Sequence, residues 1–143
     1  KYLIDLLKKE YKEVYFWPQG NTDFEYLNSF YNLKDISILE RTLDSYNDLL
    51  TNNDIDYVGS RLHGGIHALQ HKKRAIILAV DNRALEISKD TNIPVIKINE
   101  IKQKLKDKIN SKWNVNIYLN NDNIKKWKET TKSLINNYEE TNK

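Results

Sequence analysis

The sequence predicts an α/β fold in which helices cover both faces of a parallel sheet. Three apolar runs in the middle of the chain support this class. The run at 56–58 stops at a glycine and a helical pattern follows at once, the run at 74–80 leads through an aspartate cap into a helix over 83–90, and the run at 93–98 comes next. Strands that alternate with helices at this spacing form parallel sheets, and such sheets bind ligands at the carboxyl ends of their strands.

The first part of the chain shows the same alternation. Apolar residues at helical spacing predict a helix over 2–11, and the β-rich run 14–17 follows it and stops at a proline. A polar turn then leads to a short helix over 24–30. We expect a further strand over 36–39 and a helix over 43–52 before the central strand.

The last part of the chain is predicted to be helical. Asn99 is expected to cap a helix over 101–109, and a polar link over 111–123 follows. The last helix places one apolar stripe along its length: Ile124, Trp127, Leu134, Ile135 and Tyr138.

Composition limits the class of protein. The 143 residues, with three tryptophans and nine tyrosines, suffice for one domain with a core, and the absence of cysteine excludes disulfides and cysteine nucleophiles and favours a cytoplasmic location. No apolar run approaches the roughly 20 residues that span a bilayer, so we expect no transmembrane segment. A peripheral contact with a membrane is compatible with this composition. The net charge of +3 is too small for a nucleic-acid-binding surface. The chain lacks methionine, from which we expect a fragment of a longer polypeptide.

The turn after the central strand carries the candidate site. Ser60, Arg61 and His63 stand at a helix start, where unpaired amides and the helix dipole favour an anion. An arginine in this position opposes the dipole, so Arg61 indicates an anionic ligand, with a surface ion pair as the alternative. His63 is either a functional group or a packing histidine. Gly64 and Gly65 cost about 1 kcal/mol each relative to alanine, which indicates close approach to a ligand or tight packing against the neighbouring strand.

The next turn repeats this arrangement. Asp81 is expected to cap the following helix, Arg83 again stands at a helix start, and Glu86 is either a site residue or a solvated helix residue. Two arginines at neighbouring helix starts favour a doubly charged or acidic ligand.

Three histidines could also suggest a metal. His63, His67 and His71 are spaced at i, i+4 and i+8. The glutamate of the H-E-x-x-H pattern is missing and His71 is expected to lie beyond the helix end, so we expect no metal site.

These turns resemble polysaccharide pyruvyl transferases. The resemblance comprises an arginine–x–histidine signature within 59–64, a D-x-R-x-x-E element at 81–86 and an isoleucine–proline strand at 92–96, all in the order of that family. It covers about 55–98, roughly a third of the chain.

The resemblance implies a two-domain, GT-B-like enzyme of which this Rossmann-like chain is the second domain, with one more strand before Lys1. Without that strand the sheet would have a gap or would close up. The family transfers pyruvyl from phosphoenolpyruvate to a glycan or lipid-linked sugar and uses no other cofactor. Arg61 matches its anion-binding arginine and His63 its acid–base or phosphate-contacting histidine. The expected substrate-binding residues are Ser60, Gly64, Asp81, Arg83 and Glu86.

Two other functions remain open at this point. A GT-B nucleotide-sugar glycosyltransferase would use the same arginines for its diphosphate donor. The second alternative is that a half domain without its partner domain is a non-catalytic interaction module. If the chain does belong to a pyruvyl transferase, we expect this fragment alone to be inactive.

Overall fold

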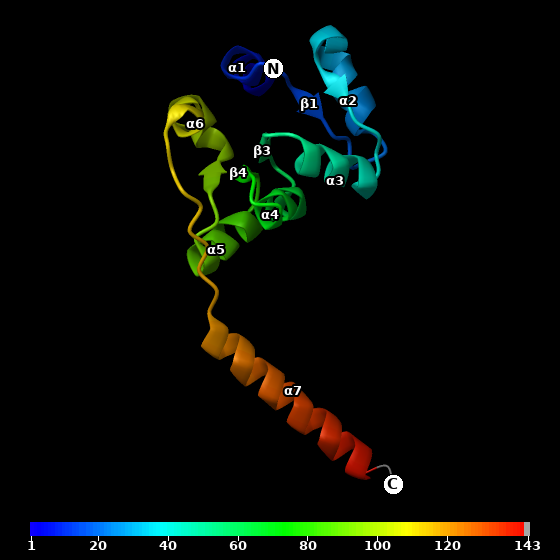
Figure 1. The fold of residues 1–143 in the computed structure, drawn as a ribbon, viewed down its shortest axis with the longest axis vertical. Helices are drawn as coiled ribbons and strands as arrows, with labels where there is room; N and C mark the ends of the chain where they lie inside the picture. The colour runs from blue at the N-terminus through cyan, green and yellow to red at the C-terminus, as the bar shows by residue number, and fades with distance from the viewer. Residues whose placement is uncertain (142–143) are drawn as a thin grey trace.

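The structure is a computed structural model that describes the backbone of residues 1–141 and the side chains of residues 1–135 (Figure 1). Its strands are β1 (Tyr15–Phe16), β2 (Ser37–Ile38), β3 (Asp56–Gly59), β4 (Arg74–Ala79) and β5 (Val95–Lys97). Its α-helices are α1 (Tyr2–Glu10), α2 (Asp23–Phe30), α3 (Leu43–Asn52), α4 (Leu62–Gln70), α5 (Asn82–Thr91), α6 (Ile101–Asn110) and α7 (Asn121–Thr141). Two short 3₁₀ turns are η1 (Leu33–Asp35) and η2 (Ile98–Glu100). The predicted α/β class and the order of its elements are confirmed.

The strands form two parallel sheets instead of one. β1 pairs with β2, so that Tyr15 lies opposite Ser37, and a second sheet has the order β3-β4-β5, with Val58 opposite Ile76. The parallel direction was expected. β1 and β3 do not pair with each other, and within residues 1–141 no strand pairs with both of them.

Helices cover both faces of the larger sheet, as predicted. On one face α1 and α6 pack through Leu6 and Leu105 against Ile76 and Leu78 of β4. On the other face α4 and α5 pack against the alternate β4 residues, Ile77 and Ala79. β4 is therefore a central strand that is buried on both sides, which explains its unbroken apolar sequence.

Two local predictions need correction. Asn99 does not cap α6, since it lies within η2 and the residue before α6, Glu100, has helical backbone angles instead of the extended ones of an N-cap. The strand predicted from Ile93 begins only at Val95, because a proline precedes Val95 and proline has no N–H for the sheet.

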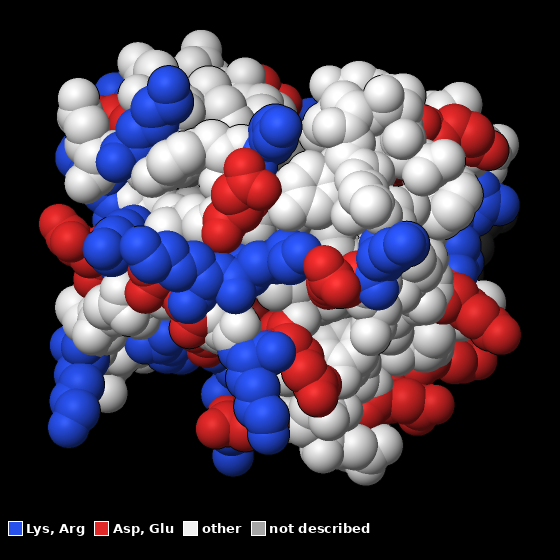
Figure 2. All heavy atoms as spheres, turned by 90° about the horizontal axis from the view of Figure 1, so that it is seen from above, with Lys and Arg blue, Asp and Glu red and all other residues white. Residues whose placement is uncertain are grey.

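Helix α7 projects from the α/β body (Figure 1). Its apolar stripe is exposed at Ile124, Trp127, Leu134 and Ile135, and the side chain of Tyr138 lies outside the described residues. Of the helices in residues 1–141, none combines the length and the apolarity that crossing a bilayer requires. Seen from above, the molecule carries positive and negative side chains interspersed with one another (Figure 2).

Candidate functional site

A cavity of about 1120 Å³ lies between the two sheets and reaches their carboxyl ends. Its wall includes residues of α1, β1, α2, β3 and the turns that follow β3 and β4. Ser60, Arg61 and His63 line it from the β3–α4 turn, and Asp81 and Arg83 line it from the β4–α5 turn. The structure therefore brings five of the seven predicted site residues to one cavity.

The β3–α4 turn places Arg61 directly before α4. Arg61 has an extended backbone, and in the described structure the start of α4 has no side-chain cap. The first hydrogen bond of the helix runs from the Gly65 N–H to the Arg61 carbonyl at 3.1 Å. The amides of the first turn thus lack a side-chain acceptor next to a guanidinium, which is an environment that favours an anion.

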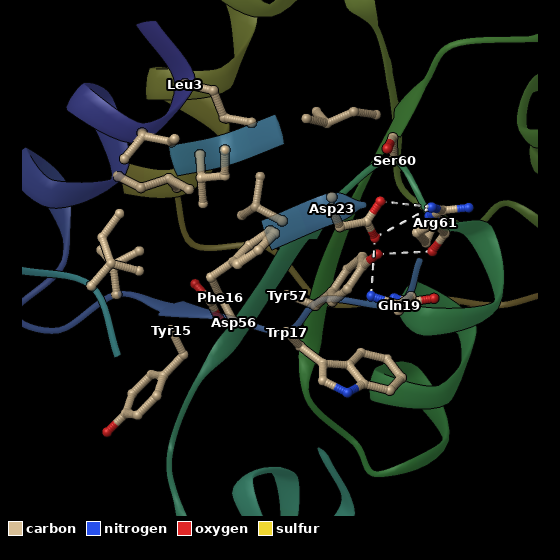
Figure 3. A pocket seen from close by; sticks show the side chains of 18 of the residues that line it. Leu3, Tyr15, Phe16, Trp17, Gln19, Asp23, Asp56, Tyr57, Ser60 and Arg61 are labelled. Atoms are coloured by element: carbon tan, nitrogen blue, oxygen red, sulfur yellow. Dashed lines mark hydrogen bonds and ion pairs between the residues drawn. The ribbon is translucent and has the colours of Figure 1, made fainter. Parts of the chain in front are cut away.

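The Arg61 guanidinium faces the carboxylate of Asp23, and both residues line the cavity (Figure 3). The Nη2 atom of Arg61 lies 3.3 Å from Oδ1 of Asp23. Oδ2 of Asp23 accepts the backbone N–H groups of Gln19 at 3.0 Å and Gly20 at 2.7 Å. The Gly20 N–H is the largest cause that lowers the pKa of Asp23 from its ordinary value, so this carboxylate is charged and held on the β1–α2 turn.

This ion pair is open to exchange with a ligand. The Arg61 side chain is 57% exposed, and an exposed pair of this kind stabilises a protein by about 0–1 kcal/mol. The backbone of the turn is held separately, since the Tyr57 hydroxyl donates to the Arg61 carbonyl at 2.8 Å. Burial raises the pKa of Tyr57 to about 12, so the hydroxyl stays protonated as a donor.

His63 lies in the first turn of α4, and its exposed side chain lines the cavity. Gly64 follows it but is buried, and its carbonyl accepts the Tyr46 hydroxyl at 3.0 Å. A Cβ on Gly64 would lie 3.1 Å from both the Gln19 side chain and the Tyr57 hydroxyl. Packing accounts for this glycine, and Gly64 does not line the cavity.

The β4–α5 turn is an internally paired unit. Asp81 caps α5 by accepting the backbone N–H of Arg83 at 3.0 Å, as predicted, and its second oxygen accepts the Arg83 guanidinium at 2.8 Å. The hydrogen bond from Arg83 lowers the pKa of Asp81. Arg83 thus has a carboxylate partner in its own turn, which accounts for a cation at this helix start. Glu86 lies outside the cavity, and its exposed carboxylate pairs with Lys89 at 2.7 Å.

The β1–α2 side of the cavity contributes residues that the sequence does not identify as site residues. Besides Asp23, an aromatic wall is formed by Trp17, whose ring stacks on Tyr46 with centroids 4.1 Å apart and whose indole donates to the Thr42 carbonyl at 3.1 Å. Trp17 and Tyr46 both line the cavity. The polar turn after β1 was visible in the sequence, but its partner across the cavity was not.

The other histidines have structural contacts. His67 Nε2 lies 2.6 Å from the Asn47 side-chain oxygen, and His71 Nδ1 lies 3.0 Å from the His67 carbonyl, just beyond the end of α4 as predicted. In the part of the chain that the structure describes, no cluster of three histidine or carboxylate side chains has the geometry to hold a metal.

No family model, curated protein or solved structure matches this chain. The candidate site therefore depends on the residues and contacts described above.

Proposed function

We propose that this chain is the C-terminal, GT-B-like half of a polysaccharide pyruvyl transferase and that the cavity binds phosphoenolpyruvate. One observation carries the proposal: Arg61 and His63 from one strand-to-helix turn and the Asp81–Arg83 pair from the next line one cavity at the carboxyl ends of parallel strands. These positions are where α/β sheets bind ligands.

The electrostatics of the Arg61 turn support an anionic substrate. Phosphoenolpyruvate carries a phosphate and a carboxylate, and the Asp23 carboxylate already occupies the position that such a group would take on Arg61. Charge-assisted hydrogen bonds to a ligand contribute about 1.5–3 kcal/mol, more than the exposed pair that they would replace. A ligand anion can therefore displace Asp23 at little cost.

The reaction needs two proton movements and no redox step. The methylene carbon of phosphoenolpyruvate gains a proton, and C2 becomes electrophilic and is attacked by one sugar hydroxyl. A second hydroxyl of the same sugar then displaces phosphate and closes a cyclic ketal. One of the two hydroxyl protons balances the proton taken up by carbon, and the other leaves on phosphate. His63, in the first turn of α4, is the side chain we propose to move a proton.

The acceptor is a sugar of a glycan or a lipid-linked intermediate, held with the help of an N-terminal domain. Because a GT-B-like site is completed between two domains, residues 1–143 alone should form no ketal. The donor is expected to be used in the cytoplasm.

The test compares two variants of the full-length enzyme. Arg61→Ala removes ground-state hydrogen bonds to the anion and should raise the KM for phosphoenolpyruvate by about tenfold to a hundredfold. His63→Gln should leave KM nearly unchanged and lower kcat by about 10²–10⁴-fold. Arg41→Ala is the matched control, because Arg41 is an exposed arginine that does not line the cavity, and it should behave as wild type.

A ligand titration separates the competing enzyme class. Phosphoenolpyruvate should raise the Tm of the full-length protein, and Arg61→Ala should reduce this shift at the same ligand concentration. A Tm shift produced only by UDP- or GDP-sugars would instead identify a glycosyltransferase. In the kinetic comparison, wild-type turnover by His63→Gln would show that His63 moves no proton in the reaction.

A further inference from the structure

Helix α7 exposes an apolar stripe that the rest of the described structure does not cover (Figure 1). The side chains of this stripe are 41% exposed at Ile124, 67% at Trp127, 64% at Leu134 and 52% at Ile135. Among the α7 side chains that the structure describes, residues 121–135, none is buried. An amphipathic helix takes most of its stability from burial of its apolar face. The stripe therefore calls for a surface that covers it.

The start of α7 is fixed locally and is attached to the α/β body. The Asn120 side-chain oxygen accepts the backbone N–H of Asn123 at 3.0 Å and so caps the helix. The Tyr118 amide donates to the last carbonyl of α5 at 2.8 Å, and the Asn92 side chain donates to the Asn116 carbonyl at 2.8 Å. A surface that binds α7 therefore also holds the body of the protein.

Charged side chains are sorted around α7 relative to the stripe. Successive residues of an α-helix are rotated by about 100°, so the four stripe residues fall within an arc of about 100°. Lys128 and Lys132 follow at one border of this arc, about 20° and 60° beyond Ile135. Asp122 and Glu129 lie on the opposite side of the helix. In the part of α7 whose side chains are described, the charges that border the stripe are therefore positive.

The stripe suits the boundary between lipid and water. Thr131 lies within the same arc, and its hydroxyl donates to the Trp127 carbonyl at 2.9 Å, so this polar group is satisfied within the helix. Tryptophan and tyrosine side chains favour the membrane–water interface, where one part of the ring system is apolar and the other is wet. Tyr118 and Leu119 add further exposed side chains immediately before the helix.

A second copy of the chain fits the stripe less well than a lipid surface does. If Ile124 is position a of a heptad, the next two core positions hold Trp127 and Thr131. A large indole and a polar threonine make a poor two-helix core. The flanking residues Lys128 and Thr130 offer no opposite charges for pairing between helices. A lipid surface requires neither regular packing nor paired charges, and anionic headgroups attract lysines.

We propose that α7 is a membrane-surface helix that docks the protein on an anionic lipid bilayer. The apolar stripe lies at the boundary between headgroups and acyl chains, and Lys128 and Lys132 contact the headgroup phosphates. The 21 residues of α7 lie along the bilayer surface, and the attachment to α5 keeps the α/β body beside it. This docking does not depend on the ligand of the cavity, so a failure of the proposed function leaves it unaffected.

The test is sedimentation of the full-length protein with lipid vesicles. Vesicles of equal parts phosphatidylcholine and phosphatidylglycerol should bind the protein. Vesicles of phosphatidylcholine alone should bind it about tenfold or more weakly, because each lysine near an anionic surface strengthens binding by roughly fivefold. Added salt should weaken the binding to the anionic vesicles.

A matched pair of charge variants assigns the binding to α7. The double variant Lys128→Gln/Lys132→Gln should weaken binding to the anionic vesicles by about tenfold to thirtyfold. Its control is Lys102→Gln/Lys106→Gln, which removes two exposed lysines at the same spacing from α6. Both variants change the net charge equally, so the control should bind within about twofold of the wild type.

A second pair tests the apolar contact. Leu134→Ser should weaken vesicle binding by about tenfold, because the leucine side chain leaves water when the stripe enters the lipid. Leu43→Ser is the control, since Leu43 on α3 is a similarly exposed leucine outside the stripe, and it should bind as the wild type does. Far-UV circular dichroism of all variants checks that they are folded.

Three results would overturn the proposal. Absence of binding to the anionic vesicles would exclude a lipid surface as the occupant. Equal losses in the α6 and α7 lysine variants would show only a general attraction between cationic side chains and anionic lipid. Self-association that Leu134→Ser abolishes, in a protein that does not bind vesicles, would show that a second copy of the chain covers the stripe.

Discussion

Replacement of Gly65 by alanine should destabilise the protein although alanine is the better helix former. A Cβ at this position would lie 2.5 Å from Cγ1 and 2.9 Å from Cδ1 of Ile77. Carbon atoms in contact prefer about 3.5–4.0 Å. Ile77 is completely buried in the central strand and cannot swing away, so α4 would have to move off the sheet.

The expected magnitude is a balance of two opposing terms. Overpacking of a core costs about 1–3 kcal/mol. Replacing a glycine within a helix by alanine stabilises the helix by about 1 kcal/mol. We therefore expect Gly65→Ala to lower the free energy of unfolding by about 0–2 kcal/mol, with the same m-value in urea.

A double-mutant cycle tests the cause. Ile77→Ala removes both crowded carbons and should by itself cost about 2–5 kcal/mol. In that background Gly65→Ala should become stabilising, because the new methyl group fills part of the space and the helix gains propensity. The assay is urea unfolding of all four proteins, followed by far-UV circular dichroism.

Gly64→Ala is the matched control. Its Cβ would lie 3.1 Å from both the Gln19 side chain and the Tyr57 hydroxyl, contacts that need a smaller shift than the 2.5 Å contact at Gly65, so the change should be tolerated better. Stabilisation by Gly65→Ala of about 1 kcal/mol in the wild-type background would refute the contact with Ile77 as the reason for this glycine.

Two further predictions concern charged pairs. Burial raises the pKa of the Asp56 carboxyl, but its hydrogen bonds, chiefly from Arg74, outweigh this effect. The pKa in the folded protein therefore lies below the ordinary 3.8. The ion pair contributes its full stabilisation above that ordinary pKa, and the contribution is lost as the pH falls through the pKa of the folded protein. At pH values below about 4, the urea midpoint of the wild type should therefore decrease, while the midpoint of Asp56→Asn should decrease less. Parallel pH dependence of the two midpoints would contradict this. Asp23→Asn removes the carboxylate that competes for Arg61 but keeps an oxygen for the turn amides, so the full-length enzyme should bind phosphoenolpyruvate about two- to fivefold more tightly in calorimetry, whereas weaker binding would show that Asp23 positions the arginine.

The sequence alone determined the features that depend on neighbours along the chain. The unbroken apolar run of β4 identified a strand buried on both faces, and Asp81 was recognised as the cap of α5 because an N-cap bonds the amide two residues later. Local sequence pattern also predicted the β3–α4 turn, with Arg61 and His63 at the start of the helix that follows it.

Only the tertiary structure decided what these residues face. The carboxylate on Arg61 comes from Asp23, 38 residues away, and the reason for Gly65 is Ile77 on the next strand. The family resemblance left open whether the sheet has a gap or closes up, and only the structure shows the strands divided into two sheets. Strand pairing depends on backbone groups that are distant in sequence and that carry no side-chain signature. Capping hydrogen bonds and hydrophobic periodicity involve residues only a few positions apart, so they can be predicted from the sequence. Contacts across the cavity form only after loop closure has brought separate elements together.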